Sequence, residues 1–317
     1  MSTLPVIAVV VPCFNEQAAL PITAKRLLEV LDCMASSGLI SEESYILCCN
    51  DGSRDLTWNV IQMLHAGNPK IKGISLAHNR GHQYALLAGL MTVRGRCDAA
   101  ISIDADLQDD VNAMTEMVEK FRQGYEIVYG VRASRATDSW FKRTTARAFY
   151  SVQQKMGLDT IYDHADYRLM SNRALDILSQ YGESNLFLRG IIPQIGLSTA
   201  IVTYDRHERV AGESKYPLKK MISFSIDGIT SFSSRPIRMI LLLGVLLLVL
   251  DVIMCIYVAV AYFGHEAIPG WTSLMLSVWF LGSVTLIGLG VVGEYIGKIF
   301  VEVKHRPRYN ISEYLLD

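Results

Sequence analysis

Short apolar runs alternate with amphipathic stretches through the first two thirds of the 317-residue chain. Because the runs are apolar throughout rather than at every second position, they predict strands buried on both faces of a sheet. The predicted strands cover residues 6–12, 45–50, 71–77, 99–104, 126–130 and 198–204. The amphipathic stretches between the first five predict helices over residues 16–36, 55–65, 82–93 and 111–122. This alternation predicts an α/β domain with a mostly parallel sheet covered by helices on both faces.

The character of the chain changes after Pro236. Residues 239–263 carry a single charge, Asp251, and residues 271–292 carry none. A helix of about 20 apolar residues crosses the hydrocarbon core of a bilayer, so both segments are long enough to span it. The short connection over residues 264–270 places both outer ends on one side. The pattern therefore predicts a C-terminal transmembrane hairpin of two helices.

Basic residues indicate which side of the membrane the outer ends occupy. Arg235 and Arg238 precede the first predicted span, and Lys298 and Lys304 follow the second. The connecting loop contains neither Lys nor Arg. Because Lys and Arg accumulate in cytoplasmic loops, the N-terminal domain and the C-terminus are predicted to face the cytoplasm.

The segment before the first span predicts an amphipathic helix with Lys219 and Lys220 at the edge of its apolar face. Its place beside a predicted span favours a helix in the membrane interface. The alternative is a helix that packs on the globular domain. The predicted organisation is a cytoplasmic domain, an interfacial helix, two transmembrane helices and a cytoplasmic tail, at residues 1–215, 216–235, 236–300 and 301–317.

Composition narrows the class of protein further. Half of the residues are hydrophobic and the mean hydropathy is +0.25, which is high for a soluble domain. The net charge of −1 argues against general nucleic-acid binding. The six cysteines show no CxxC and no zinc-ligand spacing, so we expect reduced, buried side chains.

Polar motifs follow four of the predicted strands directly. In chain order they are PCFNE, NDGSRD, NRGHQ and DADLQ. In open α/β sheets, ligands bind beyond the carboxyl ends of the parallel strands. The four motifs are therefore predicted to form one composite site.

The DADLQDD segment contains the densest group of carboxylates. Asp104 and Asp106 are two residues apart, so in an extended segment their side chains point the same way. Two adjacent carboxylates repel each other, and a divalent cation removes that penalty. Oxygen ligands suit Mg²⁺ or Mn²⁺, and Gln108 can supply another oxygen. Asp109 and Asp110 precede a predicted helix and are expected to cap its free N–H groups.

Taken in order, PCFNE, NDGSRD, NRGHQYALLAGL, DADLQ and GESKY resemble the motifs of family 2 glycosyltransferases of the Rossmann-like GT-A fold. The set is most similar to polyprenyl-phosphate glycosyltransferases, the group of dolichol-phosphate mannose synthase and the bactoprenol glucosyltransferases. The resemblance extends over essentially the whole chain, and the ending GEYIGKIF resembles the bacterial membrane-anchored branch. Two positions depart from the usual motifs: Asn50 stands for the first Asp of DDGS, and Phe14 for the aromatic of PxYNE.

The resemblance implies a role for several residues of this chain. It makes Asp104, Asp106 and Gln108 ligands of Mg²⁺ or Mn²⁺ on the donor diphosphate. It places Pro12, Glu16 and Asp51 at the nucleotide, and Arg132 and Arg143 near the acceptor phosphate. It makes Asp166 the proposed catalytic base. It also implies a loop that closes over the diphosphate and the lipid phosphate and that contains Arg206, Arg209, Ser214 and Lys215.

The chemistry leaves the role of Asp166 open between two alternatives. A polyprenyl phosphate is already ionised near neutral pH, so a base has little proton to remove. Asp166 therefore either acts as a weak base or orients an arginine or the sugar. His78, His82 and His164 lie near the motifs and are expected to be structural residues.

The reaction that the resemblance implies is transfer of one sugar to undecaprenyl phosphate at the cytoplasmic face of a bacterial inner membrane. The expected donor is UDP-glucose, and the expected sugar is glucose, transferred with inversion. The lipid-linked product would serve envelope glycan or O-antigen modification. An aminoarabinose-type transferase is the nearest alternative. A processive polysaccharide synthase would carry a QxxRW motif and more spans, and neither is found. The alternative from another functional class is a non-catalytic membrane scaffold or lipid-translocating protein. Separately, the predicted transmembrane helices offer a surface through which a homo-oligomer could form.

Overall fold

The computed structural model describes residues 4–132, 164–183, 186–205 and 270–317, and five isolated positions between 240 and 253. The chain divides into two compact units. The first contains Met1–Tyr150, Asp159–Tyr216 and Arg306–Asp317, and the second contains Ser151–Leu158 and Pro217–His305.

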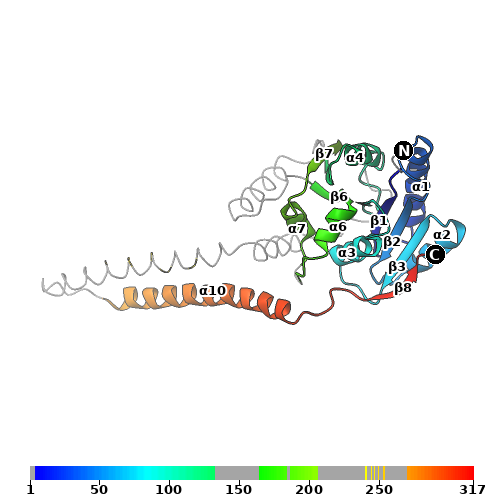
Figure 1. Ribbon diagram of the computed structural model, residues 1–317. Helices are drawn as coiled ribbons and strands as arrows, with labels where there is room; N and C mark the ends of the chain where they lie inside the picture. Colours follow the sequence, from blue (N-terminus) through cyan, green and yellow to red (C-terminus); the bar gives the residue numbers. More distant parts are fainter. Residues whose placement is uncertain are drawn as a thin grey trace. The chain divides into compact units, whose positions relative to one another are not determined.

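An eight-stranded sheet forms the centre of the first unit, in the order β7-β5-β6-β4-β1-β2-β3-β8 (Figure 1). The first four strands along the chain are β1 (Ile7–Cys13), β2 (Tyr45–Asn50), β3 (Ile71–Leu76) and β4 (Ala99–Ser102). They pair in parallel with one another, β1 lying between β2 and β4. Their side chains are almost entirely buried, as continuous apolar runs require. These four strands confirm the predicted parallel core.

The sheet as a whole is mixed, so the prediction of a mostly parallel sheet needs correction. The remaining strands are β5 (Ile127–Arg132), β6 (His164–Ser171), β7 (Thr199–Tyr204) and β8 (Ile311–Leu315). Strand β6 lies between β4 and β5 and runs antiparallel to both, and β8 runs antiparallel to β3 at the edge. Strand β7 pairs in parallel with β5. Strands β6 and β8 were not predicted, because HADYRLMS and ISEYL lack continuous apolar runs.

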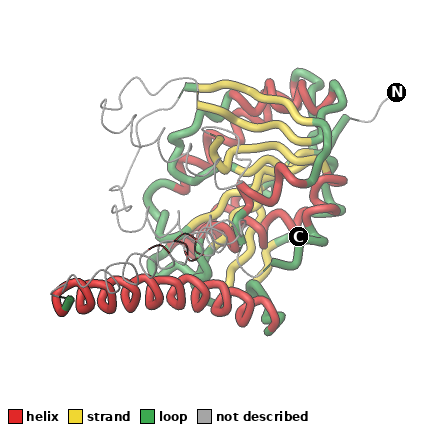
Figure 2. The backbone as a smooth tube through the Cα atoms, turned by 90° about the vertical axis from the view of Figure 1, so that its left-hand side faces the viewer, coloured by secondary structure: helices red, strands yellow, loops and turns green. Residues whose placement is uncertain are grey.

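Helices cover both faces of this sheet, as Figure 2 shows with the strands in yellow and the helices in red. The helices of the first unit are α1 (Leu20–Ser36), α2 (Thr57–Gly67), α3 (His82–Val93), α4 (Ala113–Arg122), α6 (Asn172–Leu178) and α7 (Leu188–Gln194). Helices α1, α2 and α4 contribute to one buried cluster with Val9 and Val11 of β1. Helix α3 packs on the opposite face, where Gly89 approaches Val10 and Cys49. The predicted helices are confirmed, but three of them begin later than predicted.

The second unit contains α10 (Trp271–Val303). At 1.5 Å per residue this helix is about 50 Å long. Residues Phe280–Val303 are apolar enough to cross a membrane, with a mean hydropathy of 1.6. The first predicted span, at residues 239–263, lies outside the described residues apart from five positions, and so does the predicted interfacial helix at 216–235. The hairpin therefore stays a prediction.

Candidate active site

The loops after β1 and β2 are joined by hydrogen bonds between their polar residues. The Asn15 N–H donates to Ser53 Oγ at 3.0 Å, and the Arg54 N–H donates to Asn15 Oδ1 at 2.9 Å. The Glu16 N–H donates to Thr57 Oγ1 at 2.9 Å. Helix α1 begins only after this loop, at Leu20 rather than at Glu16. The PCFNE and NDGSRD motifs thus form one rigid edge, as their positions after adjacent strands predict.

Asp51 connects this edge to the loop after β3. Its carboxylate accepts the Arg80 N–H at 2.7 Å and the Gly81 N–H at 2.9 Å. The residue is buried; burial raises the pKa of the carboxyl group, and the two N–H donors oppose that shift. Both oxygens already have backbone partners, so Asp51 holds the NRGH loop in place. The predicted contact between Asp51 and the nucleotide stays a proposal.

The C-terminal segment binds the other side of the NRGH loop. The Arg80 guanidinium donates from Nε to the Arg308 carbonyl at 2.9 Å and from Nη2 to the Pro307 carbonyl at 3.0 Å. Strand β8 follows directly and pairs with β3. The sequence predicted residues 301–317 only as a tail, whereas residues 306–317 belong to the same unit as the sheet. The alternation of ISEYL was too weak a signal to find this strand.

We expect Arg80→Gln to weaken donor binding, because the loop that carries His82 loses its contact with the C-terminal segment. A loss of one or two charge-assisted hydrogen bonds predicts an affinity about 10-fold lower. Calorimetry of nucleotide-sugar binding to the full chain measures the change. Lys72→Gln is the matched control, since Lys72, near the start of β3, donates from Nζ to the Leu316 carbonyl at 2.6 Å. Equal effects of both substitutions would show that only the attachment of β8 matters.

Asp104 and Asp106 follow β4 at the same end of the sheet. Partial desolvation and the nearby carboxylates of Asp166, Asp109 and Asp106 raise the pKa of Asp104, and His82 opposes the shift. Asp106 Oδ1 accepts the Gln108 N–H at 3.2 Å. Because three neighbouring carboxylates raise the pKa of Asp104, a bound cation would relieve the repulsion between them.

This donor set fits Mg²⁺ or Mn²⁺. The side chain of Asp104 is 39% exposed, so its oxygen can be reached from outside. Among the described residues, no group of three or more His, Cys, Asp or Glu side chains is arranged to hold a metal ion by itself. Mg²⁺ commonly takes one or two carboxylates and completes its shell with water and substrate phosphates. The pair therefore suits a cation that arrives with a phosphorylated ligand.

Asp166 lies on β6, next to β4 in the sheet, and is surrounded by basic groups. Its carboxylate accepts hydrogen bonds from the guanidinium groups of Arg168 and Arg189. Burial raises the pKa of Asp166, but the two arginines and His82 outweigh it and hold the pKa well below its usual range. The carboxylate therefore remains ionised and is a poor proton acceptor at neutral pH.

His82 connects the two acidic groups. Its Nε2 atom lies 3.5 Å from Asp104 Oδ1 and 3.5 Å from Asp166 Oδ2. Burial lowers the pKa of His82, but Asp104 and Asp166 outweigh it and raise the pKa to about 9. The sequence predicted a structural histidine, whereas the structure places it inside the site. Its position directly after NRG at a strand end was the available signal.

Arg132 ends β5 and pairs with a buried carboxylate. Its Nη2 lies 3.2 Å from Asp109 Oδ1, which also accepts the Tyr204 hydroxyl at 2.8 Å. Asp109 is thus the centre of a buried network, and the prediction that it caps a helix was wrong. Asp110 does accept the Asn112 N–H at 2.9 Å before α4. The Asp109 network ties the segment after β4 to the ends of β5 and β7.

For the other predicted site residues, the structure either gives a position in the fold or does not describe them. Pro12 is buried in β1 opposite Cys49, and Glu16 lies partly buried in the loop after β1. Five predicted residues lie outside the described part of the chain: Arg143, Arg206, Arg209, Ser214 and Lys215.

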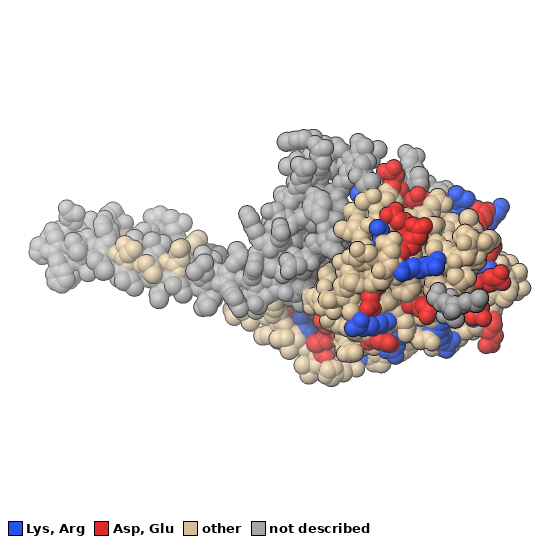
Figure 3. Space-filling view, turned by 45° about the horizontal axis from the view of Figure 1, so that its top comes forward, with Lys and Arg blue, Asp and Glu red and all other residues tan. Residues whose placement is uncertain are grey.

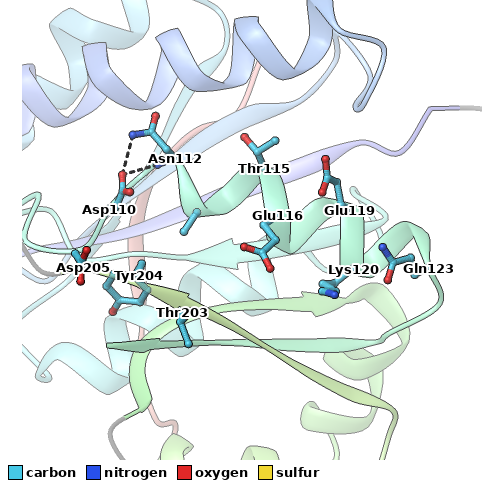
Figure 4. Close-up of a pocket in the computed structure, with 11 residues that line it drawn as sticks. Asp110, Asn112, Thr115, Glu116, Glu119, Lys120, Gln123, Thr203, Tyr204 and Asp205 are labelled. Atoms are coloured by element: carbon cyan, nitrogen blue, oxygen red, sulfur yellow. Dashed lines mark hydrogen bonds between the residues drawn. The ribbon is translucent and has the colours of Figure 1, made fainter. Parts of the chain in front are cut away.

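A hollow of about 810 Å³ lies elsewhere on the first unit, between α4 and the end of β7 (Figure 4). Glu116 and Glu119 of α4 line it opposite Thr203 and Asp205. Asp110 and Tyr204 line it, whereas Asp104 and Asp166 do not. On the face drawn in Figure 3, acidic and basic side chains are interspersed over the described residues.

The chain has an α/β domain with a parallel core and acidic loops at the carboxyl edge of that core. Comparison with known proteins identifies its family. The chain belongs to glycosyl transferase family 2, whose model matches residues 8–194. With the mixed sheet, this match confirms the predicted GT-A glycosyltransferase domain.

Relatives match nearly the full length of the chain. An uncharacterized glycosyltransferase YkoT of Bacillus subtilis (strain 168) is 52% identical over 308 residues, which is 97% of this chain and 91% of that protein. The bactoprenol glucosyl transferase of Shigella phage SfV is 38% identical over 309 residues, covering 96% and 98%. A solved glucosyl-3-phosphoglycerate synthase from Mycobacterium tuberculosis, in complex with Mn²⁺ and UDP-glucose, is 19% identical with a TM-score of 0.44, covering 71% and 77%.

Proposed function

We propose that this glycosyltransferase moves one glucosyl residue from UDP-glucose to undecaprenyl phosphate at the cytoplasmic face of a bacterial inner membrane. The product would be a polyprenyl-phosphate-linked sugar for envelope glycan or O-antigen modification. The bactoprenol glucosyl transferases that match nearly the whole chain support this acceptor and this sugar. The apolar helix α10 supports an enzyme attached to the membrane in which the acceptor resides.

One observation carries the proposal: His82 Nε2 lies within 3.5 Å of both Asp104 and Asp166. These carboxylates come from β4 and β6, which are far apart in the chain but adjacent in the sheet. The contact joins Asp104, predicted for the donor metal, to Asp166, predicted as a base or as a residue that orients an arginine or the sugar. Transfer between two substrates requires both groups in one site.

The donor side rests on the residues after β1, β2 and β4. Asp104, Asp106 and Gln108 would hold Mg²⁺ or Mn²⁺, which when bound neutralises charge on a departing nucleoside diphosphate. Pro12, Glu16 and Asp51 would position the nucleotide. The hydrogen bonds between their loops keep this edge preorganised, so little ordering is needed when the donor binds.

The acceptor side needs cations more than a base, because the phosphate nucleophile is already ionised. Arg132 and Arg143 would attract it, and Arg206, Arg209, Ser214 and Lys215 would close over both phosphates. A single displacement at the sugar gives the inverted product. Residues 1–215 would form the cytoplasmic catalytic domain, to whose sheet strand β8 of the C-terminal segment is added. The interfacial helix would cover residues 216–235, and the transmembrane hairpin residues 236–300.

The test is a transfer assay with the full chain in detergent or lipid nanodiscs. Undecaprenyl phosphate, Mg²⁺ or Mn²⁺ and a panel of labelled nucleotide sugars are supplied, and the organic phase is counted. We expect label from UDP-glucose to become lipid-soluble only with the metal present. If label from an aminoarabinose donor becomes lipid-soluble instead, the transferred sugar is aminoarabinose rather than glucose. No transfer from any donor, with no nucleotide binding, would favour a membrane scaffold and overturn the proposal.

A further inference from the structure

The surroundings of Asp166 contain a cation that no sequence motif assigned. Arg189, in α7, binds the Asp166 carboxylate with both arms: Nε lies 3.2 Å from Oδ1 and Nη2 lies 2.9 Å from Oδ2. Its side chain is 36% exposed, whereas that of Arg168, the other arginine at Asp166, is 1% exposed. Of these two guanidinium groups, only that of Arg189 reaches the surface of the site.

Arg189 is also fixed relative to the donor side. The Leu188 N–H donates to Gln83 Oε1 at 2.9 Å. Gln83 follows His82, whose Nε2 lies 3.5 Å from Asp104 Oδ1. The start of α7 is therefore attached to the same turn of α3 that contacts the acidic pair, so Arg189 has a set position beside it.

An anionic acceptor near Asp166 needs a cation beside it, and Arg189 is placed to supply that cation. A phosphate brought near the ionised Asp166 would be repelled, and repulsion is strong where water is partly excluded. A cation must stand between the two anions. Arg168 is too deeply buried to do so, but Arg189 already faces Asp166 on its exposed side. A guanidinium suits the task because its planar fork binds phosphate and carboxylate oxygens in pairs.

We infer that Arg189 binds the phosphate of the acceptor, and that Asp166 is a positioning residue that acts through Arg189 rather than a base. This inference rests on the proposed function. It assigns the acceptor phosphate a partner within the described sheet unit. The depressed pKa of Asp166 agrees with it, because a carboxylate that remains ionised serves better as an anchor than as a proton acceptor.

The test is a double-mutant cycle with Arg189→Gln, Asp166→Asn and the double variant. A short-chain prenyl phosphate serves as the soluble acceptor, and calorimetry with UDP-glucose and Mn²⁺ measures donor binding. We expect Arg189→Gln to raise the acceptor KM about 10- to 100-fold, with donor affinity changed less than about 3-fold. Asp166→Asn should reduce kcat/KM in the unmodified chain and change it less than about 3-fold in the Arg189→Gln background.

Two further variants make the result specific. Arg189→Lys retains the charge without the fork, so it should show a smaller increase in acceptor KM, and it carries the test if Arg189→Gln does not fold. Arg173→Gln is the control, since Arg173 is an exposed arginine of α6 that pairs with Glu126 at 2.7 Å. It should leave both KM values unchanged.

The outcomes separate this inference from the proposed function. An unchanged acceptor KM in Arg189→Gln and Arg189→Lys, in a chain that transfers sugar, overturns the inference alone. So does an undiminished effect of Asp166→Asn in the Arg189→Gln background, which would make Asp166 an independent base. A chain that transfers no sugar to any prenyl phosphate overturns the proposed function and the inference with it.

Discussion

Replacing Asp104 or Asp106 with asparagine is expected to abolish sugar transfer, lowering kcat/KM by about a thousandfold or more. Loss of one preorganised group that stabilises developing charge commonly costs a hundredfold to a thousandfold, and a lost metal removes a larger charge. The fold should survive, because Asp104 lies among Asp166, Asp109 and Asp106 and its own charge is unfavourable there. The midpoint of thermal unfolding should therefore not fall. Transfer assays and thermal melts of the full chain measure both effects.

Two comparisons make this expectation specific. Asp110→Asn is the control, because among the described residues the carboxylate of Asp110 accepts hydrogen bonds from Asn112 alone, at the start of α4. Asn retains an acceptor oxygen, so activity should stay close to that of the unmodified chain. Asp166→Asn should keep some turnover, since its carboxylate holds arginines rather than the donor cation. Equal losses at Asp104, Asp106 and Asp166 would contradict this division of roles.

Replacing Gly52 with alanine is expected to have the second-largest effect. Gly52 has φ of +59°, and a Cβ there would lie 2.6 Å from the Asn79 nitrogen and 2.6 Å from the His78 carbonyl carbon. Both neighbours are backbone atoms of the loop that Asp51 holds, so that loop must move. Strain and overpacking together should cost about 2–4 kcal/mol, which lowers the melting midpoint by about 5–10 °C. Donor binding should weaken as well, because the moving loop leads into His82.

Gly38→Ala separates the two causes of this effect. Gly38 also has a positive φ, +70°, but a Cβ there meets no atom within 4 Å. Its replacement adds backbone strain of about 1 kcal/mol without a clash. We expect a smaller shift in the melting midpoint and unchanged donor affinity. If both variants melt alike and bind donor alike, the close approach of Gly52 to the NRGH loop has no consequence.

Local patterns predicted the bounds of two elements that are largely apolar. The strand at 45–50 and the helix at 82–93 have the same bounds in the structure as in the sequence prediction. The strand is buried throughout and the helix is buried over most of its length, so the apolar residues themselves indicate both elements. The position of polar motifs after parallel strands likewise predicted the edge of the sheet at which a site is built.

Local patterns failed where a residue is used by a distant segment. Helix α1 begins at Leu20 rather than at Glu16, after a loop whose Glu16 and Gln17 N–H groups donate to Thr57 and Asp55 of the neighbouring loop. Asp109 has the sequence of a helix cap, but Arg132 and Tyr204 recruit it into a buried network. In each case the residue type suits both a place at a helix start and a contact with another segment. Which of the two forms depends on the partner that the fold brings near.

By itself the sequence determined a parallel α/β core, an acidic pair at its carboxyl edge, a strongly apolar C-terminal part and a resemblance to family 2 glycosyltransferases. Only the tertiary structure decided that β6 enters the sheet beside β4 and that β8 returns to β3. These pairings bring Asp166 and Arg189 to His82, and Pro307 to Arg80. The physical reason is that strand pairing joins residues far apart in the chain, and their charges acquire partners only after that pairing is made.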